Sequence, residues 1–190
     1  MKIGLLCLQG AFLEHKTMLE GLGASCFEIR QRRDLPDSFD GLVLPGGEST
    51  VMGKLLRDLE LLEPLKTVIA SGLPTFGTCA GLLLLAKRIE DGEKTHLALM
   101  DITARRNAYG RQLGSFRAEA EFGGLGKIPM VFIRAPYISQ TGEGVQVLAA
   151  VNEKMVAARQ NNLLVCAFHP ELTEDVTVHQ YFLQMGKGRG

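Results

Sequence analysis

Four short apolar runs, separated by segments with helical spacing, occupy the first half of the chain and constrain its fold most. The runs predict strands over residues 2–8, 24–30, 39–47 and 73–77. Apolar residues at helical intervals predict helices over 13–23, 49–72 with a break at Pro64, and 80–92. Strands that alternate with helices in this way form a parallel sheet with both faces covered. We therefore expect an α/β fold, a flavodoxin-like three-layer sandwich with a mostly parallel central sheet.

The second half changes character, because residues 97–168 carry strand-like pieces and few helical signals. The pieces are 102–112, 116–122, 130–138, 145–151, 154–162 and 163–168. We expect them to form an antiparallel or mixed extension of the same sheet, with a hairpin turn at Asn161-Asn162. A closing helix is expected over 173–188, starting near Thr173 or Glu174. No repeat or linker divides the chain, so we expect one domain over residues 1–190.

Charge and cysteine usage exclude several classes of function. Lys plus Arg number 21, as do Asp plus Glu, so nothing indicates nonspecific nucleic-acid binding. The opening apolar run ends at Gln9 and Gly10, short of a signal or membrane-spanning length, which favours the cytosol. No C-x-x-C pair occurs, so free thiols are expected rather than a metal site or a disulfide framework. The cysteines are Cys7, Cys26, Cys79 and Cys166.

The stretch GTCAG, residues 77–81, places a cysteine between two glycines where an expected strand meets an expected helix. A helix N-terminus favours the thiolate, which is the useful nucleophile. Gly77 and Gly81 allow a tight turn and close packing of the helix, as in the nucleophile elbow of hydrolases. By itself the pattern also fits a packed structural cysteine. The functional interpretation makes Cys79 a catalytic nucleophile.

A nucleophilic cysteine needs a base and a group that orients the base. The stretch FHPE, residues 168–171, supplies both. Pro170 keeps His169 out of a helix, and residues two apart in an extended chain point to the same side. His169 and Glu171 can therefore share a face. Alone, such a triplet is more often part of a loop than of a catalytic site, so the assignment depends on Cys79.

The stretch LPGGEST, residues 44–50, follows another expected strand. Two glycines let the backbone approach a ligand and turn its N–H groups toward it, and Ser49 can cap the next helix. An oxyanion formed at Cys79 needs two donors, and we assign the N–H groups of Gly47 and Ala80. An ordinary turn with a good cap is the alternative.

The other histidines, His15, His96 and His179, lack comparable neighbours in sequence. His15 and His179 fall in expected helices, so we interpret them as surface or packing residues.

Together these motifs resemble the class I (triad) glutamine amidotransferases and, within them, the glutaminase subunits of pyridoxal 5'-phosphate synthase. The matching stretches span nearly the whole chain. They are LQGAFLEH (8–15), GLVLPGGEST (41–50), GTCAGLLLLAK (77–87), RNAYGRQ (106–112), FIRAP (132–136) and FHPELTED (168–175).

The resemblance implies hydrolysis of L-glutamine to glutamate and ammonia, with ammonia passed to a synthase subunit that builds pyridoxal 5'-phosphate. It implies Cys79 as nucleophile, His169 as base and acid, and Glu171 as the orienting group. The residues implied at the glutamine site are Gly47, Glu48, Ser49, Arg106, Ile133 and Arg134. Gln9 and Gly10 match a loop that lies near the synthase in this family. Pyridoxal phosphate would be the partner's product, so no cofactor is implied here.

Two alternatives remain open at this point. One is a glutaminase that serves another synthase, such as that of histidine biosynthesis, or a stand-alone γ-glutamyl hydrolase. The other is a nonenzymatic flavodoxin-like binding or stress-response module in which Cys79 is a redox sensor. Such a module would need no pairing of His169 with Glu171.

Overall fold

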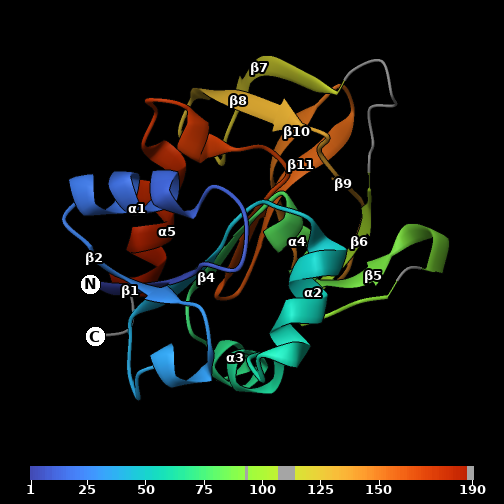
Figure 1. The fold of residues 1–190 in the computed structure, drawn as a ribbon. Coiled ribbons are helices and arrows are strands. Elements are labelled where there is room, and N and C mark those ends of the chain that lie inside the picture. Colours follow the sequence, from blue (N-terminus) through green and yellow to red (C-terminus); the bar gives the residue numbers. More distant parts are fainter. Residues whose placement is uncertain (93, 107–113, 188–190) are drawn as a thin grey trace.

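The computed structural model describes residues 1–92, 94–106 and 114–187. One large sheet runs through the molecule, with helices on both faces (Figure 1). Its strand order is β2-β1-β3-β4-β12-β11-β9-β6-β5, and β10 pairs with β11 outside this path. The expected three-layer α/β sandwich is confirmed.

Five adjacent strands run parallel and form the centre of the sheet. They are β2 (Ser25–Ile29), β1 (Lys2–Leu6), β3 (Gly41–Leu44), β4 (Thr75–Thr78) and β12 (Leu163–Cys166). Every residue of β3, β4 and β12 is buried, as expected of strands covered on both faces. Because the strands are parallel, the loops that follow β3, β4 and β12 meet at one edge of the sheet, where ligands bind in such folds.

The helices cover opposite faces of these strands (Figure 1). On one face lie α1 (Phe12–Gly21) and α5 (Thr177–Lys187). On the other lie α2 (Ser49–Asp58) and α3 (Leu62–Ala70), and the short α4 (Ala80–Leu85) packs against α2. Three short 3-10 helices complete this part: η1 (Arg32–Asp34), η2 (Glu90–Gly92) and η3 (Pro170–Leu172).

The extension is mixed, as expected, but part of it leaves the main sheet. The strands that continue the sheet are β11 (Lys154–Gln160), β9 (Tyr137–Thr141), β6 (Met100–Arg105), β5 (Ala86–Ile89) and β10 (Gln146–Val151). In contrast, β7 (Ser115–Glu121) and β8 (Lys127–Ile133) pair only with each other in a second, two-stranded sheet. The hairpin turn at Asn161-Asn162 is confirmed, since Gln160 pairs with Leu163 and Asn161 has a φ of 52°.

Three expected boundaries are wrong. The helix expected over 80–92 ends at Leu85, and β5 follows it because Ala86–Ile89 pairs with β6. The break in 49–72 lies before Leu62, where Glu60 has a φ of 53°, and Pro64 falls in the first turn of α3, where proline is tolerated. The last helix begins at Thr177, whose N–H donates to the carboxylate of Asp175.

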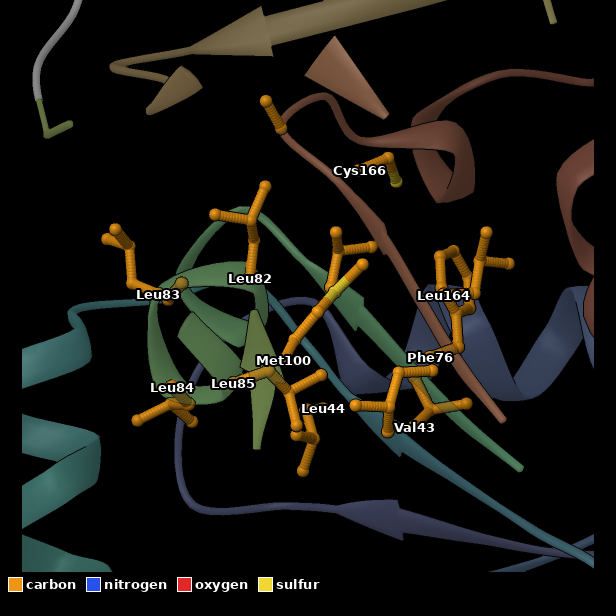
Figure 2. Packing of buried hydrophobic residues seen from close by; sticks show 14 of the residues in the cluster. Val43, Leu44, Phe76, Leu82, Leu83, Leu84, Leu85, Met100, Leu164 and Cys166 are labelled. Carbon is orange, nitrogen blue, oxygen red and sulfur yellow. The ribbon is translucent and has the colours of Figure 1, made fainter. Parts of the chain in front are cut away.

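The α4 leucines join the sheet residues in one hydrophobic core. All six residues of α4 are buried. Figure 2 shows Leu85 and Met100 close to Leu44, whereas Leu82 and Leu83 project from other sides of α4, and all of them belong to the same cluster of buried residues. A short helix that is apolar on every side therefore sits deep in the molecule, and its N-terminus is held in place by packing. Among the described residues, no helix combines the length and the apolar character needed to cross a membrane.

Candidate active site

Cys79 lies in the tight turn between β4 and α4. Its φ is 50° and its ψ is −99°, a strained conformation for a residue with a side chain. The flanking glycines make the turn possible. A Cβ on Gly77 would lie 2.7 Å from the carbonyl carbon and oxygen of Gly81, and a Cβ on Gly81 would lie 2.0 Å from the carbonyl oxygen of Leu44. Both glycines are needed for close packing of α4 on the strands.

His169 and Glu171 follow β12, the strand that neighbours β4. The Nδ1 of His169 lies 2.7 Å from Oε1 of Glu171, and the side chain of Glu171 is fully buried. The backbone N–H of His169 donates to the carbonyl of Val131 in β8, and η3 packs against this strand. The β7-β8 sheet, which is separate from the main sheet, therefore holds the backbone of His169 in place.

The electrostatics of His169 link it to both neighbours. Burial lowers the pKa of His169, but hydrogen bonds with Cys79 and Glu171 and the charges of both outweigh burial and raise it to about 10. Burial raises the pKa of Glu171, but His15, when it is protonated, and the hydrogen bond and charge of His169 lower it below its usual value overall. A thiol, an imidazole and a carboxylate thus form one connected, mostly buried array.

The glycine pair after β3 closes over this array. A Cβ on Gly46 would lie 2.5 Å from Cε1 of His169 and 3.4 Å from Cβ of Cys79. Gly10 in turn contacts Gly46, since a Cβ there would lie 1.6 Å from the carbonyl oxygen of Gly46. Only residues without side chains fit at these two positions, so the backbone of this loop lies directly beside the cysteine and the histidine.

A cavity of about 800 Å³ opens at this edge of the sheet. It is lined by every site residue predicted from the sequence except Glu171, which lies behind His169. The predicted residues on its wall are Gln9, Gly10, Gly47, Glu48, Ser49, Cys79, Ala80, Arg106, Ile133, Arg134 and His169. The structure therefore brings the separate motifs together. The remainder of the RNAYGRQ motif, 107–112, lies outside the described residues.

Glu48 organises the polar side of the cavity. Its backbone N–H donates to Oε1 of Gln9 at 2.8 Å, and its carboxylate forms an ion pair with Arg106. Burial raises the pKa of Glu48, but hydrogen bonds from Thr50 and the charge of Arg106 lower it overall. The predicted helix cap at Ser49 is wrong: Glu48 is the N-cap of α2, and its side chain accepts from the N–H of Thr50.

Of the two interpretations of His15 and His179, surface or packing residues, the structure confirms packing. Both are fully buried, so neither is a surface residue. The Nε2 of His15 lies 3.4 Å from Oε2 of Glu171, and its Nδ1 lies 2.9 Å from Nε2 of His179. Helical spacing in the sequence could have predicted the burial of His15. His15 and Leu19 are four residues apart, so they lie on one face of α1, and they are its buried residues. A histidine at a core position of a helix beside the cysteine strand is the feature that sequence reasoning missed.

Within residues 1–92, 94–106 and 114–187, no group of three or more His, Cys, Asp or Glu side chains is arranged to hold a metal ion. The four cysteines are free thiols, and burial raises the pKa of Cys7 and of Cys26 to about 11.

Residues 5–187 match the sequence model of the SNO glutamine amidotransferase family. The chain belongs to this family. Among curated relatives of this amidotransferase, the pyridoxal 5'-phosphate synthase subunit PdxT of Streptococcus pneumoniae strain ATCC 700669 is 58% identical over 190 residues, which cover 98% of each chain. The same protein from Streptococcus pneumoniae strain 70585 matches to the same extent.

Solved structures agree with the family assignment. A crystal structure described as a glutamine amidotransferase superposes with a TM-score of 0.92 at 43% identity, covering 97% of this amidotransferase and 98% of that chain. The structure of PurLQS from Thermotoga maritima superposes with a TM-score of 0.72 at 13% identity, covering 98% and 97% of the two chains, which shows a shared fold alone.

Proposed function

We propose that this chain hydrolyses L-glutamine to L-glutamate and ammonia and supplies the ammonia to a synthase subunit that makes pyridoxal 5'-phosphate. The observation that carries the proposal is the connected array in which Cys79 and His169 lie at the cavity wall and Glu171 lies behind His169, with 2.7 Å between His169 Nδ1 and Glu171 Oε1. The relatives named PdxT support the choice of synthase. Pyridoxal phosphate is then the partner's product, and the glutaminase step requires no cofactor.

In the proposed reaction, the sulfur of Cys79 attacks the side-chain carbonyl carbon of glutamine. The N–H groups of Gly47 and Ala80 stabilise the oxyanion of the tetrahedral intermediate. His169, which has taken the proton of the Cys79 thiol, transfers it to the departing nitrogen. The C–N bond then breaks, ammonia leaves, and the acyl group stays on Cys79 as a thioester. Water, deprotonated by His169, then attacks the thioester and releases glutamate. Throughout, Glu171 holds the imidazole through Nδ1.

The cavity wall complements the charges of glutamine. Glu48 offers a carboxylate to the α-ammonium group, and Arg106 and Arg134 offer guanidinium groups to the α-carboxylate. Ser49 and Ile133 complete the proposed substrate site. Arg134 has a φ of 43°, and its N–H donates to the carbonyl of Gly114, so this segment is held in a strained conformation beside the cavity.

Gln9 and Gly10 are exposed at the cavity and are proposed to contact the synthase. Ammonia is useful only if it stays unprotonated, so an enclosed route to the partner fits the chemistry. We propose that residues 1–190 act as one glutaminase domain in the cytoplasm, where a nucleophilic thiol stays reduced.

The deciding experiment measures glutamate release from glutamine with and without the synthase partner. Release that rises when the synthase is added supports the proposal, whereas equal release in both samples favours a stand-alone hydrolase. A glutamine-analogue diazo-ketone provides a second measurement, because it should label Cys79 covalently. Absence of both glutamate release and labelling would favour the redox-sensor alternative.

A further inference from the structure

Two buried histidines that take no part in the reaction steps above lie directly behind Glu171. His15 in α1 and His179 in α5 are each 0% exposed. The ring of Phe76 meets both edge-on, with ring centroids 5.8 Å from His15 and 5.6 Å from His179. Polar rings in such an apolar environment are costly unless they are hydrogen-bonded. The hydrogen-bond partners of the two histidine rings therefore explain how these rings can be buried.

His15 faces the carboxylate oxygen that His169 does not use. Its Nε2 lies 3.4 Å from Oε2 of Glu171 and 3.1 Å from Oγ1 of Thr78. The other carboxylate oxygen, Oε1, is the one that lies 2.7 Å from His169. Oε2 has no hydrogen-bond partner of ordinary geometry among the described residues. His15 Nε2 is thus placed between the triad carboxylate and the residue that precedes Cys79.

The contacts select one tautomer of His15. If its proton is on Nε2, this N–H donates to Oγ1 of Thr78 and lies beside Oε2 of Glu171, and the bare Nδ1 accepts from Nε2–H of His179 at 2.9 Å. Only an acceptor, Nδ1 of His179, then lacks a partner. The opposite tautomer would turn a lone pair of His15 toward the carboxylate and leave a buried N–H of His179 unsatisfied. Orphaned buried N–H groups are the rarer and costlier case.

The imidazole rings of His15 and His179 are uncharged at neutral pH. Burial lowers the pKa of His15, and burial together with the neighbouring His15 lowers the pKa of His179 well below its usual value. Each ring therefore carries a single proton at neutral pH. Glu171 remains the anion of the group, and the dipole of a neutral N–H can attract its second oxygen without competing with the imidazolium of His169.

We propose that His15 is a positioning residue of this enzyme: its Nε2–H, in the tautomer that His179 fixes, donates to Thr78 and places its dipole 3.4 Å from Oε2 of Glu171, and this attraction keeps Oε1 on Nδ1 of His169. His15 lies outside the cavity wall and touches no substrate. The inference rests on the proposed glutaminase function, and it extends the triad by one histidine whose tautomer a second histidine sets.

The test compares His15→Phe, which keeps a ring but removes the donor, with His15→Gln, whose amide can reach the position of Nε2. In complex with the synthase, His15→Phe should lower kcat for glutamine hydrolysis roughly tenfold and leave KM within about twofold. The titration midpoint of His169, followed by NMR of histidine-labelled protein, should fall because Glu171 holds its imidazolium less well. His15→Gln should restore most of both quantities.

His96→Phe is the matched control. His96 is also mostly buried and hydrogen-bonded, with Nδ1 3.2 Å from Arg57, but it contacts no member of the triad in the described interactions. Its replacement should leave the His169 midpoint unchanged. An unchanged or raised midpoint in His15→Phe would overturn the proposal, as would a failure of His15→Gln to recover activity while folded.

If His15→Phe does not fold, a measurement on the unmodified protein tests the proposed role of His15. Nitrogen-15 NMR of the His15 ring should show the proton on Nε2 and a bare, hydrogen-bonded Nδ1. A proton on Nδ1 alone would turn a lone pair toward Glu171 and would rule the role out. These readings do not require turnover, so absence of glutamate release would count against the glutaminase function while the NMR data still decide the role of His15.

Discussion

Gly81 in α4 contacts the carbonyl oxygen of Leu44 in β3, at a separation that leaves no room for a side chain. This contact joins the turn that holds Cys79, the proposed nucleophile, to the strand that leads into Gly46 and Gly47. The distance between Cys79 and the proposed oxyanion donors is therefore set by backbone packing.

We expect Gly81→Ala to destabilise the protein by at least about 2 kcal/mol, because a Cβ would lie 2.0 Å from that oxygen. Urea unfolding measures the change. Gly21→Ala is the control, since a Cβ at Gly21, the last residue of α1, meets nothing within 4 Å. Equal unfolding midpoints for both variants would show that α4 can shift without cost.

Cys79→Ala should abolish glutamate release, by about a thousandfold or more, because no other group at the cavity wall can form the thioester. Thermal unfolding should remain close to that of the unmodified protein, since Cys79 adds little to the packed core. Release at the normal rate would remove the assigned nucleophile.

Glu171→Gln should lower kcat by about a hundredfold and change KM for glutamine much less, because in the proposed mechanism the carboxylate orients the imidazole, and it does not line the cavity. The amide also removes the charge that helps to raise the pKa of His169. Steady-state kinetics with the synthase present separate the two constants, and a kcat within twofold of normal would contradict the assignment.

Stability should fall at alkaline pH because of His169. Its pKa in the folded protein is about 10, above the unperturbed value of 6.5. The contribution of the protonated ring is therefore complete below pH 6.5 and disappears as the pH rises through 10, a loss on the order of a few kcal/mol. Urea unfolding of His169→Asn between pH 7 and 10 should show a shallower decline than that of the unmodified protein. Parallel declines would argue against the raised pKa.

The parallel half of the fold could be predicted from local pattern, since continuous apolar runs such as GLVL in β3 indicate strands buried on both faces. The separate β7-β8 sheet could not, because alternating exposure along β7 fits either the main sheet or an isolated hairpin. The early end of α4 also escaped prediction. Leucines suit a helix at every position, and only pairing with β6 converts Ala86–Ile89 into a strand.

At the site, the motifs predicted the residues on the cavity wall but not what lies behind them. Cys79 and His169 stand out because glycine and proline flank them. His15 and His179 carry no such neighbours and come from helices at opposite ends of the chain. Their relation to Glu171 depends on how α1 and α5 pack on the same face, which no local pattern encodes.

The pairing of β12 with β4 has a consequence for the order in which activity can arise. Thr78 pairs with Cys166, so the strand bearing His169 lies beside the one bearing Cys79, although the two are separated by most of the second half of the chain. During synthesis, a chain whose β12 has not yet left the ribosome therefore lacks the proposed base, His169. If the triad is as proposed, glutaminase activity can begin only after β12 has entered the sheet between β4 and β11.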